Sequence, residues 1–93
     1  MQTMDQIALK NGYFLGIERI ESRARLVIFE GNVEKVCRKE SVKKLKDFVQ
    51  SGENQLFKGR LQLHKNPAGI SVLVKGEIVG EICGEDMLGM MGN

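Results

Sequence analysis

The chain has 93 residues, 42 % of them hydrophobic, which fits one globular domain. Its formal net charge is +2, no stretch approaches the roughly 18 apolar residues of a membrane span, and residues 1–10 lack the basic start and the apolar run of about 7–15 residues of a secretory signal. These features argue against a disordered, membrane-spanning or secreted chain and favour a cytoplasmic protein.

The first third of the chain is expected to form strands. Asn11-Gly12 separates two apolar-rich runs, and both residues tolerate the positive φ of a two-residue hairpin turn. Residues 1–6 are expected to be a frayed end or a short helical turn, and a helix over residues 1–9 that leads into a single first strand is the alternative. Strands are predicted at residues 6–10, 13–20, 23–30 and 33–38.

The segment 41–52 is the one helix that the sequence predicts. Its apolar residues recur at helical spacing, which gives one apolar stripe: Val42, Leu45, Phe48 and Val49. Ser41 can cap the first turn by accepting a hydrogen bond from a backbone N–H, and Gly52 can end the helix. About three turns of helix are marginal alone in water, so the stripe must pack on the strands.

Three more strands are predicted after the helix, at residues 56–65, 70–74 and 77–83. In the first of them, alternation places Phe57, Leu61 and Leu63 on the core face and Lys58, Arg60, Gln62 and His64 on the polar face. In the last strand, Ile78 and Ile82 are expected to face inward and Val79 outward.

This order of elements predicts an α+β fold with a mainly antiparallel sheet, because all neighbouring strands can be joined by short connections. We expect a single domain over residues 1–83, with six or seven strands and one amphipathic helix. Residues 84–93 show no periodicity and are predicted to be a flexible tail.

No catalytic motif is recognisable, so we expect a protein that is not an enzyme and that has no metal or cofactor. The single histidine, His64, would need a cysteine within about 3 Å to form a nucleophilic pair. Two cysteines and one histidine do not fill the usual four zinc positions without carboxylates. Cys37 and Cys83 are expected to be reduced, buried or half-buried thiols, and a disulfide between them is the alternative.

The charge is unevenly distributed along the chain. Residues 31–65 carry nine basic and four acidic side chains, whereas residues 66–93 carry one basic and four acidic. Basic side chains on alternate residues of a strand lie about 6.5–7 Å apart, a spacing that can follow a phosphate backbone. A plain solvated face is the alternative interpretation. The candidate nucleic-acid-binding residues are Arg23, Arg25, Lys43, Lys44, Lys46, Lys58, Arg60, His64 and Lys65.

The segment KNGYFLGIERIESRARLVIFE, residues 10–30, resembles the start of the DNA-binding half of the middle-promoter transcription activator of T4-like phages. The likeness consists of the Lys-Asn-Gly opening and of Leu15, Ile20, Leu26, Ile28 and Glu30, and it covers less than a quarter of the chain. Separately, four strands followed by a helix are similar in topology to the repeat of the whirly and Pur single-stranded nucleic-acid binders. Both resemblances imply nucleic-acid binding as an expectation, although a fold alone does not carry a function.

The leading hypothesis is therefore a small nucleic-acid-binding or transcription-associated protein that contacts backbone phosphates. The alternative is a protein-interaction or self-associating module, for example a homodimer, because one helix leaves part of the sheet uncovered and exposed apolar patches usually mark interfaces. The residues expected at such an interface are Leu73, Val79, Met87 and Leu88.

Overall fold

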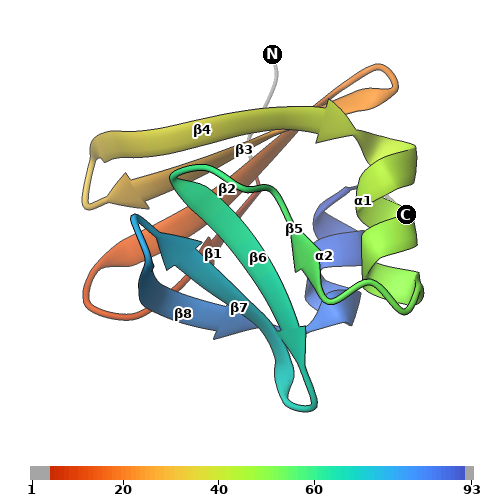
Figure 1. Cartoon of the computed structure of the whole chain (residues 1–93). Helices are drawn as coiled ribbons and strands as arrows, with labels where there is room; N and C mark the ends of the chain where they lie inside the picture. The colour runs from red at the N-terminus through yellow and green to blue at the C-terminus, as the bar shows by residue number, and fades with distance from the viewer. Residues whose placement is uncertain (1–4, 92–93) are drawn as a thin grey trace.

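A computed structural model describes residues 5–91 as two four-stranded antiparallel sheets and two helices. The first sheet contains β1 (Asp5–Ala8), β2 (Tyr13–Ile20), β3 (Arg23–Glu30) and β4 (Val33–Ser41), and it is followed by α1 (Val42–Gln50). The second contains β5 (Gln55–Leu56), β6 (Leu61–Asn66), β7 (Gly69–Val74) and β8 (Glu77–Ile82), and it is followed by α2 (Gly84–Met90). The sheets face each other and the helices lie at one end (Figure 1).

The predicted α+β class with antiparallel sheets is confirmed, but the number of elements differs from the prediction. The described residues form eight strands and two helices, where six or seven strands and one helix were expected. Each sheet has its strands in chain order, so the chain builds the same unit twice: four strands in a meander and then one helix.

The first sheet follows the hairpin signal in the sequence. Asn11 and Gly12 have φ values of 55° and 82°, and the turn pairs β1 with β2. The helical alternative is wrong for residues 5–8, which form β1, and its part at residues 1–4 lies outside the described residues. Longer ladders then join β2 to β3 and β3 to β4.

The second sheet departs from the expected strands at two places. Phe57 adopts a φ of 69°, which breaks the predicted strand 56–65 into the two-residue β5 and the six-residue β6. Lys58 and Arg60 therefore lie in the β5–β6 connection and not in a row with His64. A bulge in β8, where Val79 is the extra residue opposite Val72 and Leu73, shifts the register between β7 and β8.

The bulge reverses two predicted orientations in β8. Val79 is 6 % exposed and belongs to the core, whereas Ile78 is 55 % exposed. A strand that follows strict alternation places these two residues the other way round, and one inserted residue is enough to exchange the faces.

One hydrophobic core lies between the sheets and is closed at one end by the helices. The largest side chain that is fully buried is Phe48 of α1, and Leu15, Leu26, Leu63 and Ile70 join it from the two sheets. The expected flexible tail is wrong for residues 84–91. This segment forms α2, and its Met87 and Met91 are fully buried.

The two sheets are joined differently at their two sides. On one side the backbone N–H of Lys10 donates to the Val79 carbonyl at 2.9 Å, just beyond the end of β1. On the other side, β4 faces β6 across an open groove. Neither helix of the described chain is long and apolar enough to cross a membrane.

Candidate nucleic-acid interface

Four basic side chains surround the point where α1 begins. They are Arg23 at the start of β3, Lys39 near the end of β4, and Lys43 and Lys46 of α1. The centre of this group is the hydrogen bond from the Val42 N–H to the Ser22 carbonyl, at 2.8 Å, which ties α1 to the β2–β3 turn. These four residues are called the basic corner below.

The sheet register brings the two strand residues of the corner to the helix. Arg23 pairs with Ser41, the residue that precedes α1. Two residues further along β3, Arg25 pairs with Lys39, and both pairs lie on the same face of the sheet. Because side chains of paired residues project from the same face of a sheet, Arg23 and Lys39 both project from the outer face of the first sheet, next to the helix start.

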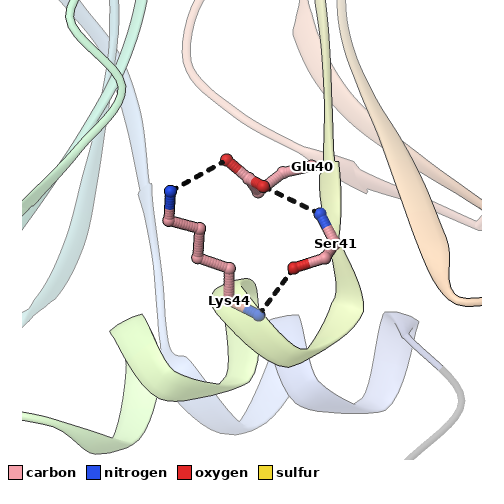
Figure 2. Close-up of polar contacts among 3 residues, drawn as sticks. All are labelled: Glu40, Ser41 and Lys44. Atoms are coloured by element: carbon pink, nitrogen blue, oxygen red, sulfur yellow. Dashed lines mark hydrogen bonds and ion pairs between the residues drawn. The ribbon is translucent and has the colours of Figure 1, made fainter.

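The helix start itself is held by local hydrogen bonds. Ser41 Oγ accepts from the Lys44 N–H at 3.1 Å, and Glu40 Oε1 accepts from the Ser41 N–H at 2.9 Å. Figure 2 shows this ring of contacts, which Lys44 closes with an ion pair to Glu40 at 3.9 Å. The cap satisfies a backbone donor that the helix leaves free, so the backbone that carries Lys43 and Lys46 is fixed.

A hollow of about 500 Å³ lies beside this start, between α1 and the β2–β3 turn. Its wall includes Arg19, Ser22, Ser41, Lys43 and Lys46, and Asp47 is the one acidic residue of the lining. Arg19 donates to the Met91 carbonyl at 2.8 Å and to the Glu21 carbonyl at 3.1 Å. It therefore fixes the wall, while its charge adds to that of the corner.

No residue of the basic corner forms an ion pair within residues 5–91, and Asp47 is the one carboxylate that shares the lining of the hollow. The ion pairs of residues 5–91 are Arg25–Glu34, Lys35–Glu30 and Lys44–Glu40, and none includes a residue of the corner. Arg23, Lys39 and Lys43 are exposed and Lys46 is half-buried. Four cations that form no ion pair in the described part of the chain thus lie near the start of α1, and Lys43 and Lys46 among them line the hollow. Such a surface favours an anionic ligand.

The predicted binding residues thus divide among several surfaces. Arg23, Lys43 and Lys46 meet at the basic corner, and Arg25 lies next to it but is paired with Glu34 at 2.9 Å. Lys44 lies on the other side of α1, with Glu40. Arg60 and Lys58 both lie in the β5–β6 connection, and Arg60 lines the groove beside β4.

Two further candidates have other partners. His64 projects from the outer face of the second sheet, where its Nε2 lies 2.9 Å from Gln62 Oε1. Lys65 turns toward the end of α1: its ammonium donates to the Ser51 carbonyl and lies 5.3 Å from the centre of the Phe48 ring. Lys65 therefore stabilises the end of the helix.

The residues expected at an apolar interface do not form one. Val79 and Met87 belong to the core, and Leu88 packs against it. Leu73 is half-buried beside the exposed Ile78 on the outer face of the second sheet. The bulge in β8 and the helix α2, neither of which the sequence predicted, account for these differences.

Two basic residues of this region, Arg19 and Lys39, are not among the nine candidates, although the sequence already places Lys39 beside the start of the helix and Arg19 beside Arg23 and Arg25. The predicted strand ended at residue 38, whereas β4 extends to Ser41 and includes Lys39. Cys37 and Cys83 are free, in line with the expectation of thiols and against the alternative of a disulfide, but both are exposed, where buried or half-buried side chains were expected. Within residues 5–91, no three acidic, histidine or cysteine side chains are arranged to hold a metal ion.

Comparison with known proteins identifies no relative. No protein-family model, no curated protein and no solved structure matches this chain.

Proposed function

We propose that the protein binds nucleic acid through backbone phosphates at the basic corner. The observation that carries the proposal is the position of Arg23 and Lys39, from two strands, and of Lys43 and Lys46, from the helix, near the start of α1. Lys43 and Lys46 line the open hollow together with Arg19, and none of the four corner residues forms an ion pair within residues 5–91. Lysine and arginine side chains that neutralise phosphates release condensed counterions, and this release supplies most of the sequence-independent affinity of nucleic-acid binding.

The chemistry of the lining favours contact with the backbone over contact with bases. None of the residues that line the hollow is aromatic, and stacking of unpaired bases requires aromatic faces. The hydroxyl groups of serine donate to phosphate oxygens in many nucleic-acid complexes, and Ser22 lines the hollow between the cations. We therefore expect affinity with little dependence on sequence.

The test compares two variants that lose the same charge at different ends of the molecule. Lys43→Gln with Lys46→Gln removes two cations from the corner, whereas Lys10→Gln with Lys75→Gln removes two exposed cations from turns outside it. Binding to a labelled duplex is measured over a series of salt concentrations. We expect the first variant to lower the slope of log K against log salt by about 1.8, since each duplex phosphate contact contributes about 0.9.

The control variant should keep the slope of the unmodified protein. An equal loss of slope in both variants would mean that only the net charge matters, and it would contradict the assignment to the corner. Absence of binding to single-stranded and double-stranded DNA and RNA at low salt would overturn the proposed function itself.

A further inference from the structure

Within residues 5–91, the first sheet ends in two edge strands, each of which has a partner strand on one side only. β1 pairs only with β2, and β4 pairs only with β3. Just beyond β1 the Lys10 N–H is bonded to the Val79 carbonyl, so the free edge of β1 consists of residues 5–8. Of the nine residues of β4, six are exposed. Such edges carry unpaired backbone N–H and C=O groups and accept another strand unless they are protected.

We propose that copies of this chain associate head to tail, with β1 of one copy pairing antiparallel to β4 of the next. The four strands of the sheet alternate in direction, so β1 and β4 run in opposite directions. A second copy in the same orientation therefore continues the antiparallel ladder without reversing the sheet. Contacts of this heterologous kind build rings or filaments.

One register of this ladder matches side chains by chemistry. When Ile7 stands opposite Val36, Asp5 stands opposite Arg38, because the sum of the paired residue numbers is constant in an antiparallel ladder. All four residues belong to the inner face of the sheet: Asp5 and Ile7 pair with Ile17 and Leu15 of β2, and Arg38 and Val36 pair with Leu26 and Ile28 of β3. This register thus places the apolar Ile7 beside the apolar Val36 and the acidic Asp5 beside the basic Arg38.

The grooves next to the two edges are also complementary in charge. The groove of about 410 Å³ beside β4 is lined by Lys35, Arg38 and Arg60, with Glu34 as its acid. The groove of about 330 Å³ beside β1 is lined by Asp5, Glu85 and Asp86 and by no basic residue. Opposite charges at the two edges favour a second copy as the occupant, and like charges oppose pairing of β4 with β4 or of β1 with β1.

The basic groove beside β4 also contains cations that an incoming acidic side chain could pair with. The Arg38 guanidinium lies 4.9 Å from the centre of the Phe57 ring, which fixes its position, and neither Arg38 nor Arg60 takes part in an ion pair within residues 5–91. An acidic strand would supply the missing partners. This proposal does not rest on the basic corner, which lies at the start of α1 and involves other residues.

Charge reversal at each edge provides the test. An acidic-edge variant carries Asp5→Lys and Asp86→Lys, and a basic-edge variant carries Arg38→Glu and Arg60→Glu. Molar mass is measured by light scattering over a concentration series at low salt. We expect the molar mass of the unmodified protein to rise with concentration and each variant alone to stay monomeric. An equimolar mixture of the two variants should regain association, because each basic edge of one variant then meets an acidic edge of the other.

Several outcomes would overturn the proposal. An unmodified protein that stays monomeric at every concentration would do so, as would a mixture that does not regain association. Continued self-association of the acidic-edge variant would indicate a two-fold contact of β4 with β4 instead. If circular dichroism shows that the basic-edge variant is unfolded, Lys35→Glu with Arg60→Glu reverses the same groove without removing the Arg38–Phe57 contact.

A matched variant separates this proposal from the proposed function. Lys43→Glu with Lys46→Glu reverses two charges at the basic corner, so it should abolish nucleic-acid binding and leave the molar mass series unchanged. If this variant instead loses association, the contact is not at the β1 and β4 edges and the head-to-tail arrangement is wrong.

Discussion

The two halves of the molecule have the same order of elements, four strands and one helix, but differ in strand length and in surface charge. The N-terminal half, β1–β4 and α1, has three strands of eight or nine residues and a helix that carries three lysines. In the C-terminal half, β5–β8 and α2, the three main strands have six residues each, and the helix carries Glu85 and Asp86 in its first turn. The surfaces of the halves therefore differ in charge, while their inner faces are both apolar.

The contrast between the differing surfaces and the apolar inner faces shows that the fold requires the inner residues. The residues that the two halves share by position are those that enter the common core, such as Leu45 in α1 and Met87 in α2, each the fourth residue of its helix. Neither half has a second layer of its own, because each sheet covers its inner face with the other sheet and the helices. The halves must therefore fold together.

The largest expected effect tests this shared core. Phe48→Ala in α1 and Met87→Ala in α2 each remove a fully buried side chain, and such truncations cost about 3–5 and 2–5 kcal/mol of unfolding free energy respectively. If the halves are one cooperative unit, both variants should shift a single urea transition, measured by circular dichroism, without splitting it.

Val33→Ala is the control for this pair, because Val33 is 58 % exposed and its loss should change the unfolding free energy by no more than about 0.5 kcal/mol. A Met87→Ala protein with two separate transitions would show that the C-terminal half unfolds by itself, and the idea of one shared core would fail.

The next effect compares one glycine with a positive φ from each half. Gly69, the first residue of β7, has a φ of 148°, and a Cβ there would lie 2.7 Å from the Ile82 carbonyl oxygen. Gly69→Ala should therefore cost about 3 kcal/mol or more, from backbone strain and from displacement of β8. Gly12, between β1 and β2, has a φ of 82° with no atom near that position, so Gly12→Ala should cost about 1–2 kcal/mol.

Thermal and urea unfolding of both alanine variants measures the difference. Gly12→Asn is the control, since asparagine tolerates the left-handed region and should recover part of the loss. Equal costs at the two glycines would mean that β7 and β8 adjust to a side chain at Gly69 without any penalty beyond that of the positive φ.

The sequence signals were strongest in the N-terminal half, and there the fold was predicted best. Asn11-Gly12 and Ser41 act through local backbone chemistry, so the first hairpin and the start of α1 could be found from short segments. The C-terminal half depends on tertiary contacts. Phe57 with its positive φ lies against Arg38 of β4, and the bulged Val79 accepts a hydrogen bond from Lys10. The helix α2 that buries Met87 contacts α1, and no local pattern indicates these features.

The candidate site was predicted in part for the same reason. The charge of residues 31–65 indicated a basic surface, and Arg23, Lys43 and Lys46 are among the residues that meet at the basic corner. The predicted row of Lys58, Arg60 and His64 required an unbroken strand, which the turn at Phe57 removes. Sheet register, which the sequence did not reveal, decides which cations meet.

The smallest expected effect concerns the two helix starts. Ser41 caps α1 with its hydroxyl, whereas Cys83 occupies the same position before α2 and makes no capping hydrogen bond. Ser41→Ala should therefore lower the unfolding free energy by about 1 kcal/mol, and Cys83→Ser, which supplies a better acceptor at the uncapped helix, should raise it by about 0.5–1 kcal/mol. Ser41→Asp keeps a hydrogen-bond acceptor at the start of α1, so its unfolding free energy should stay close to that of the unmodified protein. Urea unfolding of the three variants gives the sign of each change, and a loss of stability in Cys83→Ser would show that packing around the thiol, and not the free N–H groups, determines how α2 begins.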